Sequence, residues 1–165
     1  MTSPHGVIRI HQQEQTLTFQ VVGWGQMATS LPVRQFTEQA LAQGVRRLCF
    51  DLRHCTYLDS TFLGTLLFLQ RAAKRRIGGE LILVSPSPDC VKLLHQLGVE
   101  ACFRCLEAEE LTALAWTELV RDTSDAVAFN HNVLQAHQEL AGLAGTCGET
   151  FQPVARRLEQ DLQTE

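Results

Sequence analysis

Apolar and polar residues alternate near the start of the chain and follow a helical period further on. Alternation over residues 17–22 predicts a strand with one buried face. Residues 7–10 predict a second strand, and the polar run 12–15 predicts a hairpin connection between the two. The chain therefore opens with two paired strands.

The next segments alternate between helical and strand patterns. Apolar residues recur at helical spacing from Val33 to Leu41, with Ser30 as the predicted N-cap and Gly44 as the stop signal. Residues 46–52 then predict another strand.

A polar loop at 54–61 precedes a long apolar helix, whose predicted buried side runs as far as Ile77. Residues 80–84 predict a short strand. Ser87 then caps a further helix, which Gly98 ends.

The remaining residues predict an edge strand at 101–106 and an amphipathic helix at 107–120, with Leu111, Leu114 and Ala115 facing inward. After a polar break, two more helical patterns cover the last 40 or so residues. This order predicts an α/β fold, in which a mixed sheet of four to five strands is covered by about four helices. The predicted division is a domain at 1–120 and a helical C-terminal extension at 121–165. The extension folds back, forms a homodimer or receives a partner.

Composition limits the functions open to the chain. Its 165 residues, 45% hydrophobic and 19% charged, are typical of one globular domain with an appendage. A net charge of −4 argues against nucleic-acid binding. No apolar run has the length of a membrane span, and the first residues do not form a signal peptide, so we expect a cytoplasmic protein.

Charge and cysteine content add little chemistry. Residues 107–165 carry three Arg and eleven Asp or Glu, which indicates either an acidic tail or a solvated helical face. Cys102 and Cys105 have C-x-x-C spacing but no second pair for zinc, so we expect reduced thiols, no metal site and no cofactor.

One segment stands out for its chemistry, because Asp59 and Ser60 lie where a strand and loop enter the apolar helix. Ser60 is a natural N-cap, and Asp59 either orients the Ser60 hydroxyl or satisfies its own loop. A Ser-His-Asp triad with His54 or His95 is not expected, since the Asp and Ser are adjacent and no Gly-x-Ser-x-Gly turn is present. Without a phosphate-binding glycine loop either, an enzyme is not predicted.

This segment resembles the STAS domain of anti-sigma-factor antagonists. Their pattern is an apolar strand ending in Asp-Leu, a short loop and then Asp-Ser-Ser-Gly-Leu-Gly, which corresponds here to Asp51-Leu52 and to residues 59–64. The resemblance continues through 79–86 and 91–99, and it covers roughly residues 6–120.

The resemblance implies a phosphoprotein that regulates transcription by switching partners. Its phospho-acceptor would be Ser60, with Thr61 as second choice, modified by an anti-sigma factor serine kinase and restored by a phosphatase. A phosphate adds about −1.5 to −2 charge to the contact surface, which would separate the two proteins.

Two departures from the family pattern bear on this prediction. Phe62 replaces the first glycine of the family motif, and it is either a core residue or a partner contact. Residues 23–27 contain no carboxylate where the family often has one. The predicted partner-binding residues are Trp24, Gln26, Asp59, Thr61, Phe62 and Leu63. The alternative is a STAS scaffold that docks a signalling partner through the Ser60 loop and helix without phosphorylation.

Overall fold

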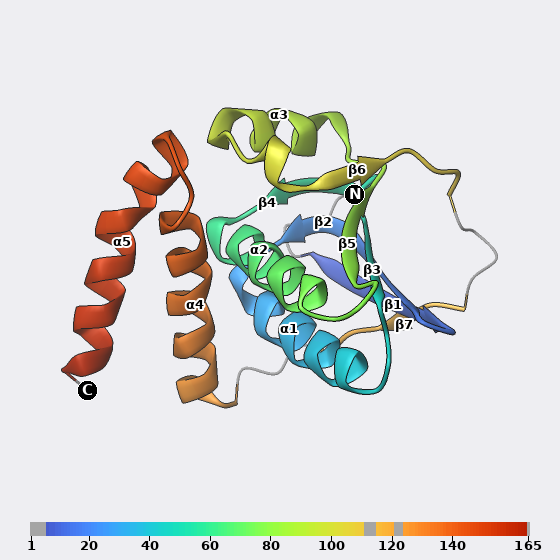
Figure 1. Cartoon of the computed structure of the whole chain (residues 1–165), viewed down its shortest axis with the longest axis horizontal. Coiled ribbons are helices and arrows are strands. Elements are labelled where there is room, and N and C mark those ends of the chain that lie inside the picture. Colours follow the sequence, from blue (N-terminus) through green and yellow to red (C-terminus); the bar gives the residue numbers. More distant parts are fainter. Residues whose placement is uncertain (1–5, 111–114, 121–123, 165) are drawn as a thin grey trace.

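A mixed β-sheet lies at the centre of the computed structural model, which describes residues 6–110, 115–120 and 124–164 (Figure 1). Within these residues there are seven strands: β1 (Val7–Gln13), β2 (Thr16–Gly25), β3 (Arg47–Asp51), β4 (Cys55–Leu58), β5 (Glu80–Val84), β6 (Arg104–Leu106) and β7 (Thr117–Glu118). The same residues form five α-helices: α1 (Met27–Ala42), α2 (Ser60–Lys74), α3 (Pro88–Leu97), α4 (Ala126–Ala141) and α5 (Thr146–Gln163), with a 3-10 turn at Glu100–Cys102.

Strand order across the sheet is β6-β5-β3-β2-β1-β7, with β4 paired to β2 outside this path. Strands β2, β3, β5 and β6 are parallel, whereas β1 runs antiparallel to both β2 and β7. The first half of β2 pairs with β3, and its last residues pair with β4 after a register shift at Gly23. This change of neighbour brings the end of β2 to the loop that precedes α2.

The hydrophobic core lies between the sheet and the helices α1 and α2, which contact each other. Phe19 of β2 and Phe50 of β3 stack with ring centroids 4.7 Å apart, and both side chains are fully buried. Ten residues of α2 are buried, because this helix lies between the sheet on one side and α4 on the other. The alternating apolar residues of the strands and the helically spaced apolar residues of α1 and α2 thus pack together in one core.

The C-terminal extension folds back on the domain as a helical hairpin, α4–α5. Helix α4 packs against α1 and α2, and α5 packs against α4 as the outermost element (Figure 1). The contact between α2 and α4 is very close: a Cβ atom added to Gly64 would lie 2.1 Å from the carbonyl oxygen of Ala136. Only glycine at this position therefore lets the two helix backbones meet.

Several sequence predictions are confirmed. The α/β class, the mixed sheet and the helical extension all agree with the structure. Ser87 caps α3 by accepting from the backbone N–H of Cys90, and Gly98 ends that helix in the left-handed conformation with φ of 69°.

The predicted strand count is too low, because two short strands were not expected. Residues 54–61 were predicted as a loop, but Cys55–Leu58 form β4 on the end of β2. The helix predicted at 107–120 is wrong for the described residues, since Thr117–Glu118 form β7 on the open edge of β1. Leu111 and Leu114 lie outside the described residues, so their predicted orientation stays untested, whereas Ala115, which was also predicted to face inward, is exposed.

Three helix ends also differ from the prediction. Helix α1 begins at Met27, so Ser30 is not its N-cap but a fully buried residue whose hydroxyl donates to the carbonyl of Met27. Helix α2 is capped by Asp59, and Ser60 is its first residue. Ile77 lies beyond the end of α2 and is 97% exposed rather than buried.

The close approach of α2 and α4 leads to a test of how the hairpin is held. We expect Gly64→Ala to lower the free energy of unfolding by at least about 2 kcal/mol, because overpacking forces the two backbones apart. Gly142→Ala is the matched control: its φ is −78° and an added Cβ has no neighbour nearer than 3.5 Å. Urea unfolding of both variants checks this, and equal stability of the two would contradict the account.

Candidate functional site

The side chain of Asp59 joins the N-termini of two helices. Its Oδ1 accepts from the backbone N–H of Phe62 at 2.8 Å, which caps α2. Its Oδ2 accepts from the backbone N–H of Met27 at 2.6 Å, at the first residue of α1. The backbone N–H of Asp59 in turn donates to Gly25 at the end of β2. One residue thus fixes the positions of β2, α1 and α2 relative to one another.

Opposing effects act on the pKa of the Asp59 carboxyl. Burial raises the pKa of this carboxyl above its usual range, while the N–H groups of Phe62 and Met27 and the nearby His137 lower it. Helix N-termini favour the ionised form, because their free N–H groups carry partial positive charge. Specific backbone donors therefore hold this carboxyl in a partly buried place.

The Ser60 hydroxyl contacts a histidine from the C-terminal hairpin. Its Oγ lies 3.0 Å from Nε2 of His137 on α4, and the two residues are 77 positions apart in the sequence. The other ring nitrogen of His137, Nδ1, lies 2.7 Å from the carbonyl oxygen of Val133. A carbonyl only accepts, so Nδ1 carries a proton; in the neutral ring Nε2 then accepts the hydroxyl proton of Ser60.

This serine–histidine pair does not form a catalytic triad. The third member of such a triad is a carboxylate on Nδ1 of the histidine, and here a backbone carbonyl occupies that place. Both oxygens of Asp59 accept from backbone N–H groups. His54 and His95, the histidines considered from the sequence, instead contact Glu110 and Glu100. The pair therefore orients a hydroxyl and links two parts of the chain.

An exposed apolar patch comprises Trp24, Met27 and Tyr57, which lie on the segments that meet at Asp59. Trp24 at the end of β2 is 41% exposed and Tyr57 on β4 is 47% exposed. These two residues pair across the strands, with ring centroids 5.8 Å apart in an edge-to-face arrangement. Met27, at the first residue of α1, is 42% exposed. Exposed aromatic side chains of this kind are typical of protein contact surfaces.

The residues predicted as partner contacts fall into two groups. Trp24 is exposed, and Gln26 and Asp59 are half-buried, so all three reach the surface. Thr61, Phe62 and Leu63 are all at most 3% exposed, and they face the core. The prediction that these three side chains contact a partner is therefore at odds with the structure, because a residue one step into α2 already points inward.

Phe62 has a structural explanation. Its ring lies against Gly25, where an added Cβ would come within 3.0 Å of a Phe62 ring carbon and 2.6 Å of the Leu58 side chain. A large residue on α2 is thus accommodated by a residue without a side chain on β2. This pair fills the core between β2 and the start of α2.

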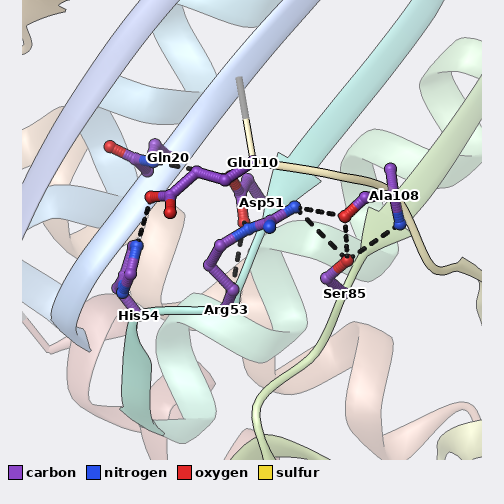
Figure 2. Close-up of polar contacts among 7 residues, drawn as sticks. All are labelled: Gln20, Asp51, Arg53, His54, Ser85, Ala108 and Glu110. Carbon is purple, nitrogen blue, oxygen red and sulfur yellow. Dashed lines mark hydrogen bonds and ion pairs between the residues drawn. The ribbon is translucent and has the colours of Figure 1, made fainter. Parts of the chain in front are cut away.

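A second polar cluster lies at the carboxyl ends of β3 and β5 (Figure 2). The Arg53 guanidinium donates to Asp51 at 3.1 Å and to the carbonyl of Ala108 at 2.7 Å, and it points toward Ser85 (Figure 2). The Ser85 hydroxyl also contacts both backbone groups of Ala108. Asp51 is buried, and its ion pair with Arg53 compensates the charge of its carboxylate. These contacts fasten the chain after β6 to the sheet.

His54 and Glu110 extend this cluster at the surface. Their hydrogen bond lowers the pKa of the Glu110 carboxyl (Figure 2). Each polar side chain of the cluster has at least one hydrogen-bond partner within the protein, which is the pattern of a structural fastening rather than of a ligand site. His137, not this cluster, is the residue beside Ser60 that sequence reasoning missed.

Among the residues that the structure describes, no three His, Cys, Asp or Glu side chains come together as a metal site. No helix among them is long and apolar enough to cross a membrane.

Fold and site together define a class of protein: a small α/β domain with a mixed sheet, two helices on one face and a serine in the first turn of the second helix. The chain belongs to the family described as "Mlab, STAS domain", whose model matches residues 8–108. The α4–α5 hairpin lies outside the matched residues. No curated protein matches the chain.

Solved structures support the same fold. The anti-sigma factor antagonist SpoIIAA in its unphosphorylated form matches with a TM-score of 0.56 and 20% identity, over 64% of this chain and 91% of that chain. SpoIIAA of Bacillus in its phosphorylated form matches with a TM-score of 0.53 and 20% identity, over 64% of this chain and 95% of that one. At this level of identity the similarity shows the shared fold.

The double role of Asp59 gives a graded test. Asp59→Ala removes acceptors for two helix N-termini, and we expect a loss of about 2 kcal/mol in the free energy of unfolding, or about 1 kcal/mol for each cap. Asp59→Asn keeps one acceptor oxygen and should lose about half as much. Urea unfolding measures both values. A loss that is equally small in the two variants would show that the bridge contributes little.

Proposed function

We propose that this STAS domain is a regulatory partner-switching protein that resembles an anti-sigma factor antagonist. In this proposal the unmodified protein binds an anti-sigma factor serine kinase and thereby regulates transcription. Phosphorylation of Ser60 by that kinase ends the complex, and a phosphatase restores it. The protein acts in the cytoplasm as a binding protein rather than as an enzyme, and it needs no cofactor.

The observation that carries this proposal is the setting of Ser60. It is half-buried in the first turn of α2, beside the exposed patch of Trp24, Met27 and Tyr57. The neighbouring hydroxyl, Thr61, is 3% exposed, so a kinase would have to unfold the helix start to reach it. Ser60 is therefore the acceptor we favour over Thr61.

The physical effect of a phosphate supports the switch. About −1.5 to −2 charge at Ser60 would lie next to the Asp59 carboxylate and beside an apolar patch. A partner that buries Trp24 and Tyr57 would have to take this charge out of water, which costs far more than burying a hydroxyl. SpoIIAA, whose structure is known in both unphosphorylated and phosphorylated forms, has the same fold.

A second candidate function is a STAS scaffold that docks its partner without phosphorylation. The Ser60–His137 hydrogen bond favours it, because a hydroxyl already bound by a buried histidine is less accessible to a kinase. A scaffold would bind its partner equally well whether residue 60 is Ser, Ala or Asp.

Peptide mapping by mass spectrometry, on protein isolated from its own cells without phosphatase treatment, tests the proposal. We expect a fraction carrying one phosphate on Ser60. In Trp24→Ala this fraction should fall at least about tenfold, because exposed aromatic anchors contribute strongly to partner binding. Ile77→Ala is the matched control, since Ile77 is 97% exposed just beyond the far end of α2. Absence of phosphate under several growth conditions would reject the switch in favour of the scaffold.

A further inference from the structure

The α4–α5 hairpin covers the helical face of the domain that carries Ser60. Asn132 on α4 is 2% exposed, and its amide donates to the hydroxyls of Ser30 on α1 and Thr65 on α2, at 3.2 and 3.5 Å. At the next turn of α4, Ala136 meets Gly64. The hairpin thus fits this face through a close backbone contact and satisfied polar groups, and Leu140 of α4 is fully buried in the core.

Charged contacts at the rim fix the position of α4. The Arg71 guanidinium donates to both carboxylate oxygens of Glu139 at 2.8 Å. Arg34 on α1 donates to Gln135, and its guanidinium also lies over the ring of Phe68 at 4.1 Å. The interface thus combines an apolar centre, in which Leu140 is fully buried in the core, with polar and charged contacts around it.

The hairpin is an addition to a domain that is otherwise complete. The family model ends at residue 108, and α4 begins at Ala126. The match to SpoIIAA uses about two thirds of this chain and already covers more than nine-tenths of the other. The α1–α2 face under α4 therefore belongs to the shared domain, whereas the α4–α5 hairpin that covers this face lies outside it.

The Ser60 hydroxyl contributes directly to this docking. His137 is 7% exposed, with its ring against Phe151 of α5, and its Nε2 has the Ser60 hydroxyl as its partner at 3.0 Å. A phosphorylated Ser60 has no hydroxyl proton to donate in any rotamer. His137 would then lose its donor, in an interface that also has to accept the phosphate charge beside Asp59.

We propose that the unmodified Ser60 hydroxyl holds the α4–α5 hairpin closed on the α1–α2 face of this domain, and that phosphorylation of Ser60 releases it. This inference rests on the proposed function, in which Ser60 is the acceptor. In the unmodified protein the hairpin covers α1 and α2, while Trp24 and Tyr57 stay exposed for the partner. The phosphate removes the hydrogen bond that the closed form needs and exposes the face under α4.

Hydrogen exchange on the full-length chain tests this proposal, with phosphoserine incorporated at position 60 during synthesis. We expect the amides of α4 to exchange at least about tenfold faster in the phosphorylated chain than in the unmodified one, while β2 and β3 keep their protection. Ser60→Ala, which loses only the hydrogen bond, should give a smaller increase of about fivefold.

Two variants on α4 define the open and closed limits of this measurement. Ala136→Glu places a charge at the contact with Gly64 and should release the hairpin. Val127→Glu makes the matching change at a position that is 69% exposed, and it should leave the hairpin docked. Retained protection of β2 and β3 shows in each case that the domain itself is folded.

Unchanged protection of α4 in the phosphoserine chain would overturn the inference. Increased protection of α4 would overturn it as well, because it would mean that His137 binds the phosphate. This outcome is separate from failure of the proposed function. If the hairpin opens in the phosphoserine chain but Ser60 carries no phosphate in cells, the proposed function fails, while the response of the hairpin to the phosphate stands. If Ser60 is phosphorylated in cells and the hairpin stays closed, only the inference fails.

Discussion

The carboxylate of Asp59 is the interaction on which the arrangement of this site depends. A helix N-terminus has backbone N–H groups without partners inside the helix, and α1 and α2 both present theirs to one side chain. Because Asp59 is also hydrogen-bonded to the end of β2, the two helices and the strand share one fixed point. Ser60 is the next residue in the chain, so the same fixed point sets its position. Trp24 and Tyr57 lie one and two residues from the groups that meet at Asp59, so the fixed point also sets where these exposed rings lie.

The second constraint comes from the C-terminal hairpin. Helix α4 reaches the same site from the opposite end of the chain, and His137 takes the hydroxyl of Ser60 as its partner. A residue that the proposed switch modifies is therefore also a residue that holds the hairpin closed. The close contact between Gly64 and Ala136 and the buried amide of Asn132 explain why α4 docks at this place on α2.

Much of the fold could be predicted from the sequence because its signals are local. Alternation of apolar residues marks β1 to β3, and Ser87 and Gly98 mark the ends of α3 through contacts within a few residues. The start of α1 could not be predicted in this way, because its cap is Asp59, 32 positions from Met27. Strands β4 and β7 were missed for a similar reason, since short strands are defined by the edge they pair with rather than by their own pattern.

The site was predicted in part. The Asp59–Ser60 pair and the exposed Trp24 follow from a motif and its neighbouring loop, whereas Phe62 and Leu63 face the core, which the motif alone does not reveal. His137 gave no signal beyond helical spacing, because only the folding of α4 onto α2 brings it to Ser60. Contacts between distant segments are the part of a site that local patterns leave open.

The hydrogen bond between Ser60 and His137 is the central claim, and nitrogen-15 NMR of the His137 ring tests it most directly. At a pH where histidine is neutral, the account predicts a protonated Nδ1, whose proton exchanges slowly with solvent, and an unprotonated Nε2. The nitrogen-15 signal of Nε2 should shift when Ser60 is replaced by Ala. A ring protonated on Nε2, or one whose signals do not respond to Ser60→Ala, would contradict the account.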